Sequence, residues 1–184
     1  IEKNPDISLV CCSALLTTTL QALRDTVASD KPVREYALFG MHGFHVNVTD
    51  GRYVYMRTPV REHLDALYDY MQTPTSYPNS VTLDKLRQGQ MCWDFPFTKG
   101  PPLLRLPGHC MGMIPNDPET LYAPDGLYGE GNLLFDLEQD LKQLQPLHDE
   151  AVESRMIEAM KQLMEENEAP AEQYVRLGLS TENT

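Results

Sequence analysis

The sequence has little positive charge. Lysine and arginine number 15 against 27 aspartates and glutamates, so the net charge is −12 at pH 7. Nucleic-acid binding depends on clustered lysines and arginines that contact phosphates, and this balance argues against a nucleic-acid partner. Many of the acidic residues lie after Asp136, where they are typical of a solvated helix face. An anionic ligand would need a locally basic pocket.

Long hydrophobic runs are also absent. The longest candidate, residues 7–16, is interrupted by Ser8 and Ser13 and has no basic segment before it. A membrane-spanning helix needs about 20 apolar residues, and a signal peptide needs a basic start. We therefore expect neither a membrane span nor a targeting segment. The chain begins with Ile1 and no methionine, which suggests an excised or truncated product.

Cysteine is scarce, and its spacing does not suit a zinc site. The four cysteines are Cys11, Cys12, Cys92 and Cys110, and none forms a CxxC pair. Adjacent Cys11 and Cys12 can pair only through a strained ring. We expect free, buried thiols, and the count leaves the redox compartment open.

Hydrophobic residues nevertheless make up 41% of the chain, which is enough for a folded core. The clearest structural signal is a hairpin. Residues 35–39 read as a strand, and residues 44–49 alternate apolar and polar side chains. Asp50-Gly51 follows and favours a two-residue type I′ turn, because both central residues need positive φ. Residues 52–57 form the returning strand, and the turn places Val48 opposite Tyr53.

Residues 149–167 give the best helix pattern. Asp149 is suited to cap it, and residues 132–137 before it read as a strand. The helix carries one apolar stripe that Met160 and Met164 widen. That stripe consists of Val152, Met156, Ala159 and Leu163.

The middle of the chain is rich in helix and strand breakers. Residues 74–124 hold nine of the 14 prolines, and residues 89–131 hold seven of the 11 glycines. We expect little regular structure there, apart from a short helix near 83–88 and a strand at 103–106. Such a long irregular stretch usually lines a site or packs on another part of a protein.

Together these patterns predict an α+β fold. It consists of an antiparallel sheet of about four strands with a long C-terminal helix packed on one face, plus a long irregular Pro/Gly-rich stretch. Residues 64–71 fit a helix or a strand, and residues 15–27 fit a short helix. The other face of the sheet would need a cover.

Two histidines and one lysine are the candidate site residues. His42 and His45 are three apart, so on one strand they would point to opposite faces and would not form a metal pair. A surface or packed histidine is the ordinary interpretation of each, although His45 and Asn47 would offer polar contacts if their face is open.

Lys99 lies among aromatic and proline residues and could bind an anion as a point charge. A solvent-exposed loop lysine is the ordinary alternative, and Arg34, Arg57 and Arg105 would serve the anion equally well. There is no GxSxG elbow, HExxH motif, Gly-rich phosphate loop or acidic metal cluster. We therefore predict no catalytic and no metal-ligating residue in this chain.

Three segments resemble the end of a known enzyme type. Residues 33–59 read VREYALFGMHGFHVNVTDGRYVYMRTP, residues 95–106 read FPFTKGPPLLRL, and residues 132–179 begin NLLFDLEQDL. Their order and spacing resemble the C-terminal part of a type I sulfatase, an arylsulfatase-like member of the alkaline phosphatase superfamily. In that family a strand of the LYDLxxDPxExxNL kind leads into the terminal helix, and Leu141 stands here where proline is usual.

The resemblance implies a fold and a division of the chain. A sulfatase has a large α/β catalytic domain followed by a smaller domain of a four-stranded antiparallel sheet and a packed helix. Residues 33–184 would be that C-terminal domain, and residues 1–32 would be the connection from the missing catalytic domain. The domain would close the substrate pocket from one side, with His42, His45 and Lys99 at its rim.

The resemblance also implies what this chain lacks. A sulfatase nucleophile lies in Cys/Ser-x-Pro-x-Arg and is oxidised to formylglycine, and a divalent cation, calcium or magnesium, neutralises charge. No cysteine here is followed by that pattern. The nearest serine match, residues 76–80, reads SYPNS and ends in Ser80 where arginine is required. Both groups would belong to the parent enzyme.

We therefore expect a sulfatase fragment that is inactive alone. Its partners would be the missing catalytic domain and, in the parent, a sulfated small molecule or glycan. A stand-alone ligand-binding or interaction module on the same scaffold is the alternative, and a small enzyme with His42 or His45 as base is a third. Bacterial periplasm or cytoplasm would suit the family. An apolar face left uncovered would make the fragment self-associate.

Overall fold

A computed structural model of the chain describes residues 24, 27–29, 34–73, 81–93, 95–108 and 117–179. Contacts divide the chain into two units, Ile1–Glu35 and Tyr36–Thr184. The connection and helix predicted within residues 1–32 fall almost wholly outside the described residues. In the part of the chain that the structure describes, no helix has the length and apolar character to cross a bilayer.

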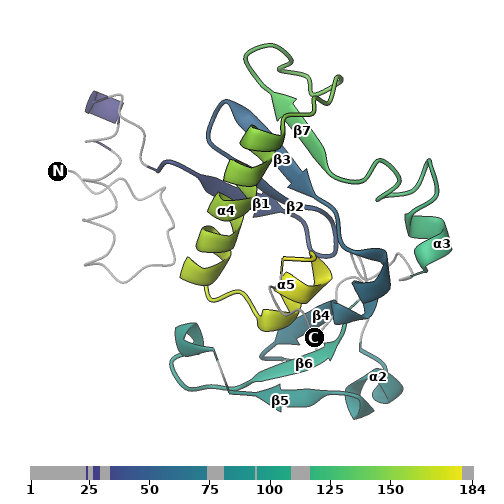
Figure 1. The fold of residues 1–184 in the computed structure, drawn as a ribbon. Coiled ribbons are helices and arrows are strands. Elements are labelled where there is room, and N and C mark those ends of the chain that lie inside the picture. The colour runs from purple at the N-terminus through teal and green to yellow at the C-terminus, as the bar shows by residue number, and fades with distance from the viewer. Residues whose placement is uncertain are drawn as a thin grey trace. The chain divides into compact units, whose positions relative to one another are not determined.

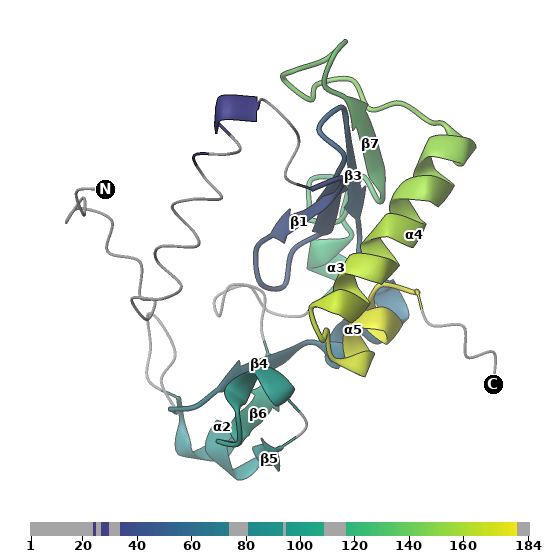
Figure 2. The same ribbon diagram turned by 90° about the vertical axis from the view of Figure 1, so that its left-hand side faces the viewer.

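The main sheet has four antiparallel strands in the order β1-β2-β3-β7. Helix α4 crosses one face of it (Figures 1 and 2). The predicted α+β fold, with a four-stranded sheet and a long C-terminal helix on one face, is confirmed. These elements are β1 (Ala37–Gly40), β2 (Val46–Thr49), β3 (Tyr53–Arg57), β7 (Leu133–Asp136) and α4 (Glu150–Glu166).

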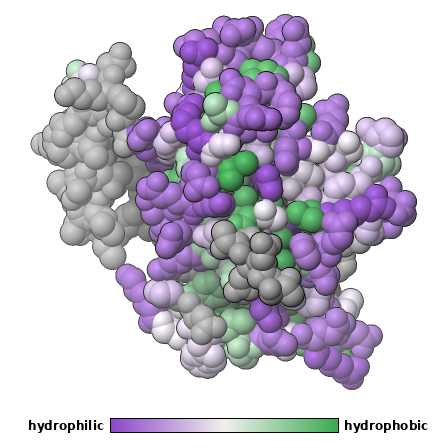
Figure 3. Space-filling view, viewed as in Figure 1, coloured by the Kyte–Doolittle hydropathy of each residue, from purple (hydrophilic) through white to green (hydrophobic). Residues whose placement is uncertain are grey.

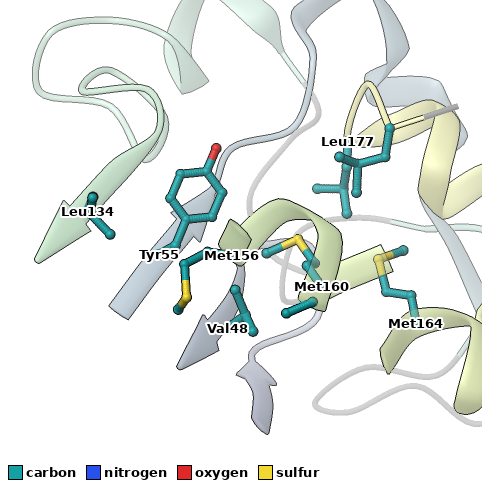
Figure 4. Packing of buried hydrophobic residues seen from close by; sticks show 9 residues of the cluster. Val48, Tyr55, Leu134, Met156, Met160, Met164 and Leu177 are labelled. Atoms are coloured by element: carbon teal, nitrogen blue, oxygen red, sulfur yellow. The ribbon is translucent and has the colours of Figure 1, made fainter. Parts of the chain in front are cut away.

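The core lies between α4 and this sheet. Met156, Met160 and Met164 lie on the buried face of the helix and pack in one cluster with Val48 and Tyr55 (Figure 4). All five side chains are at most 4% exposed. Burying one such side chain stabilises a fold by roughly 1.5–3 kcal/mol. The apolar stripe read from the sequence is therefore the core face of the helix.

The start of α4 is capped as the sequence predicts. The Asp149 carboxylate accepts hydrogen bonds from the backbone N–H groups of Ala151 (3.0 Å) and Val152 (3.1 Å). These groups have no partner within the helix, so the cap satisfies them and contributes about 1 kcal/mol.

The turn between β2 and β3 is wider than the predicted two-residue turn. Val48 pairs with Tyr55 and not with Tyr53, and the whole register is shifted by two residues. The Asp50 carboxylate accepts hydrogen bonds from the N–H groups of Arg52 (3.0 Å) and Tyr53 (2.7 Å), so a side chain closes the turn. A shift of two residues leaves Val48 and Tyr55 on the core face.

A second, three-stranded antiparallel sheet occupies the stretch expected to be irregular, in the order β4-β6-β5. The helix predicted near 83–88 and the strand at 103–106 are present as α2 and β6. The strand belongs to the second sheet, which the sequence did not indicate. The elements are β4 (Tyr68–Met71), α2 (Leu83–Arg87), β5 (Gln90–Cys92) and β6 (Leu103–Pro107).

Short helices complete the second unit. The ambiguous residues 64–71 divide into the end of a 3₁₀ helix and strand β4. Helix α5 contacts η1, and the backbone N–H of Val60 donates to the Arg176 carbonyl (2.7 Å). The helices are η1 (Arg61–Ala66), η2 (Pro96–Thr98), α3 (Pro118–Leu121) and α5 (Ala171–Arg176). Cys92 is a free, partly buried thiol, and the other three cysteines lie outside the described residues.

Candidate functional site

Both candidate histidines lie at the loop that joins β1 to β2, here called the histidine loop (residues 41–45). The backbone N–H of Phe44 donates to the Met41 carbonyl (3.0 Å) and closes a turn, with Gly43 at φ +80°. Gly40 precedes the loop at φ +154°, and a Cβ there would lie 2.8 Å from the His45 carbonyl oxygen. The loop therefore needs glycine at its base.

His42 is exposed and ion-paired. Its side chain is 47% exposed, and Nε2 lies 2.8 Å from the Asp69 carboxylate on β4. The other oxygen of Asp69 accepts from Lys85 Nζ on α2 at 2.9 Å. We call these three residues the Asp69 cluster. It joins the histidine loop to the second sheet and to α2.

Asp69 is ionised at neutral pH. Partial burial alone would raise the pKa of this carboxyl, but the hydrogen bonds from His42 and Lys85 and the positive charge of Lys85 outweigh burial and hold the pKa below its usual range. A carboxylate only accepts hydrogen bonds, so Nε2 of His42 carries the hydrogen in this pair. Nδ1 is then the ring nitrogen that a ligand can use.

His45 has a different environment. It is 9% exposed, and its ring centroid lies 5.7 Å from that of Tyr128 in an edge-to-face contact. Burial lowers the pKa of His45, the backbone hydrogen bond to Gly131 opposes this shift, and the charge of Arg176 adds to it. His45 is therefore a neutral, packed histidine. Asn47 is 8% exposed, so the face that would offer polar contacts to a ligand if it were open is closed.

Arg176 at the end of α5 holds the histidine loop in place through hydrogen bonds to its backbone. It is 2% exposed, and its Nη2 donates to the carbonyls of Gly43 and Phe44, each at 2.8 Å. The Tyr128 hydroxyl donates to the same Gly43 carbonyl. Charged hydrogen bonds of this kind are stronger than neutral ones. The loop conformation thus depends on residues more than 80 positions away in the sequence.

Among the described residues, no hydrogen bond or ion pair connects Lys99 with either histidine. It follows η2 in the left-handed conformation (φ +55°), its backbone N–H donates to Pro96, and the residue is exposed. Of the alternative arginines, Arg57 caps α5 through the Leu177 carbonyl (2.9 Å), and Arg105 lies over the Tyr68 ring (4.6 Å). The structure brings His42 together with Asp69 and Lys85 but not with Lys99.

Asp69, Lys85 and Arg176 were not predicted as site residues. Asp69 lies in the ambiguous stretch 64–71, and Arg176 in a six-residue helix that follows Pro170. These residues reach the histidine loop only through tertiary contacts of β4, α2 and α5, which the sequence pattern does not indicate.

Within the described residues, no three or more histidine, cysteine, aspartate or glutamate side chains are arranged to hold a metal ion. The described side chains thus offer no site for the divalent cation that the sulfatase resemblance places in the parent enzyme. Comparison with protein-family models, curated proteins and solved structures finds no match for the chain.

Proposed function

We propose that this chain is the C-terminal domain of a sulfatase-type sulfuric ester hydrolase. In this role it packs on a catalytic domain, helps to close the substrate pocket and has no turnover by itself. The four-stranded antiparallel sheet with α4 on one face supports the proposal, because this is the fold that the motif resemblance implies.

The three resembling segments contribute to both sheets and to the helices. Residues 33–59 contain β1, β2 and β3, residues 95–106 contain η2 and most of β6, and residues 132–179 contain β7, α4 and α5. The first and third segments supply the strands and the helix of the α4 core.

The main support for a substrate-contacting residue in this chain is the imidazole of His42, which is exposed and is fixed by hydrogen bonding. Asp69 and Lys85 fix its Nε2 side, and nearly half of the side chain remains accessible. The Nδ1 of such a group can accept one oriented hydrogen bond from a substrate hydroxyl. In this proposal His42 contacts the substrate, and His45 with Arg176 supports the loop from inside.

The parent enzyme would supply the chemistry. Formylglycine and a calcium or magnesium ion belong to the catalytic domain in this proposal, and the substrate is a sulfated small molecule or glycan. Lys99 remains a second candidate for the rim, because it is a cation on an exposed, left-handed backbone position.

The reading frame that encodes this chain tests the proposal. Its product should contain a Cys/Ser-x-Pro-x-Arg motif before residue 1, carry formylglycine by peptide mass spectrometry, and release sulfate from 4-nitrophenyl sulfate. The 184-residue chain alone should release none. A reading frame without the motif would overturn the family, and sulfate release by the chain alone that a point mutation within it abolishes would overturn the role.

A stand-alone ligand-binding module is the second candidate. It is favoured by a pocket beside the second sheet, lined in part by Tyr70, Phe95 and Arg105. A complete gene product of this length that is monodisperse and binds a ligand would support this candidate over the first.

A further inference from the structure

A pocket of about 460 Å³ lies between the second sheet and the segment that leads into α5, and we call it the β4–α5 pocket. Its volume falls within the range of small-molecule sites, roughly 300–1,000 Å³. The second sheet provides Tyr70, Cys92 and Arg105, the η2 region provides Phe95 and Pro96, and the segment opposite provides residues 168–172.

The strand register explains why one wall carries an aromatic and a cation side by side. Arg105 on β6 pairs directly with Tyr70 on β4 and with Gln90 on β5. Directly paired residues in a sheet project from the same face. The ring of Phe95 then meets Tyr70 edge to face, with centroids 5.0 Å apart, and forms an apolar corner next to the guanidinium.

The positive charge of Arg105 is not neutralised by a carboxylate among the described residues. Its guanidinium lies over the Tyr68 ring, 4.6 Å from the centroid, and Nη2 donates to the side-chain carbonyl of Gln90. A neutral amide and a ring leave the charge uncompensated. A guanidinium has five N–H donors, so others remain for a ligand anion.

The opposite wall is negative. The Glu172 carboxylate accepts a hydrogen bond from the Tyr70 hydroxyl, and Glu168 is an exposed residue at φ +55°. Neither carboxylate is ion-paired with Arg105 or with another cation in the described part of the chain. Opposite charges thus line one pocket without contacting each other.

We propose that the β4–α5 pocket binds a small zwitterion, a free amino acid with an apolar or aromatic side chain. Its carboxylate meets Arg105, its ammonium meets Glu168 and Glu172, and its side chain lies against Tyr70 and Phe95. A simple anion would face two carboxylates, and a simple cation would face the guanidinium. The inference goes beyond the proposed function and does not depend on it, because it uses only this pocket.

Calorimetric titration of the 184-residue chain tests this inference with three probes. They are L-phenylalanine, 3-phenylpropionate, which lacks the ammonium, and 2-phenylethylamine, which lacks the carboxylate. We expect L-phenylalanine to bind about tenfold or more tightly than either analogue, because each charged hydrogen bond is worth a factor of that order. No binding of L-phenylalanine, or an equal affinity for one analogue, would overturn it.

Variants locate the site. Arg105→Gln and Glu168→Gln should each weaken L-phenylalanine binding about tenfold, whereas Arg87→Gln should leave it unchanged. Arg87 is a matched control because it lies on α2, is exposed and pairs with Asp84 outside the pocket. Glu168 is exposed, and among the described residues its side chain has no ion-pair partner, so its replacement tests the site even if Arg105→Gln unfolds. Unchanged affinity in Glu168→Gln would contradict the assignment. Neither result bears on sulfate release.

Discussion

At the residue scale, the histidine loop holds two histidines in opposite environments. His42 is exposed and fixed by Asp69, whereas His45 is buried against Tyr128 beside Arg176. Their three-residue spacing separates them, since it places His42 in the turn of the loop and His45 at its last position, directly before β2. The same loop can therefore present one imidazole to a ligand while the other stabilises the backbone that carries it.

The depressed pKa of His45 predicts a pH dependence of stability. The unfolded chain binds a proton near the ordinary value of 6.5, and the folded chain binds it only at lower pH. The stabilisation that neutral His45 contributes is therefore fully present above about pH 6.5. It is lost as the pH falls from 6.5 toward the lowered pKa of the folded state. In urea unfolding from pH 7 to 5, His45→Gln should reduce the loss of unfolding free energy, and exposed His148→Gln should not. Parallel pH profiles for His45→Gln and the parent would contradict this.

The Asp69 cluster predicts the tautomer of His42. Because Asp69 accepts from Nε2, the neutral ring should carry its hydrogen there, and ¹⁵N chemical shifts of the ring nitrogens report this directly. Asp69→Ala should remove the preference and destabilise the fold by about 1 kcal/mol. The signals of His148 should stay the same. A hydrogen on Nδ1 of His42 in the unmodified protein would refute the arrangement.

The sequence predicted the kinds of candidate residue at this site but not their partners. His42, His45 and Lys99 could be chosen because their residue types and spacing are local facts. Asp69 and Lys85 reach His42 only because β4 and α2 are brought to the histidine loop, and no local pattern encodes that. The burial of His45 likewise follows from Tyr128, which lies 83 positions later in the numbering.

At the element scale, elements with strong periodicity were predictable. Helix α4 follows from its cap at Asp149 and from an apolar stripe of helical period. The hairpin strands were predictable too, but their register was not. Asp50-Gly51 was expected to form a two-residue turn, whereas the Asp50 side chain closes a wider turn by accepting hydrogen bonds from the backbone. Strand β5 has three residues and α5 six, too few to show a period.

The packing of α4 makes a quantitative prediction. Met156 is 0% exposed in the core, so Met156→Ala should lower the free energy of unfolding by about 2–5 kcal/mol through lost burial and a cavity. Met91 is 57% exposed on β5, and Met91→Ala should change stability by less than about 0.5 kcal/mol. Denaturant unfolding measures both. Equal costs for the two variants would show that α4 does not pack as described.

At the scale of the whole molecule, hydrophilic residues cover most of the face in Figure 3, and hydrophobic residues gather toward its middle. Several large apolar side chains are exposed in the described part, among them Met41 (56%), Met91 (57%) and Trp93 (68%). A domain that packs on a larger partner would bury such side chains there.

We expect the isolated chain to self-associate through these exposed side chains. Analytical ultracentrifugation should show dimers or larger species at high protein concentration, with more association at high salt, where the net charge of −12 is screened. Trp93→Ser should shift the distribution toward monomer. A strictly monomeric chain at high concentration and high salt would contradict this expectation.

In the proposed function, the chain closes the substrate pocket of a sulfatase through the histidine loop. The most direct measurement is KM and kcat for release of sulfate from a sulfated monosaccharide, whose hydroxyls can donate to Nδ1 of His42. The enzyme is the product of the encoding reading frame, and His42→Ala is compared with His148→Ala. We predict that His42→Ala raises KM about tenfold with little change in kcat, as expected for a lost substrate contact, and that His148→Ala alters neither. A product that releases no sulfate, or a His42→Ala variant with unchanged KM, would contradict this role of the histidine loop.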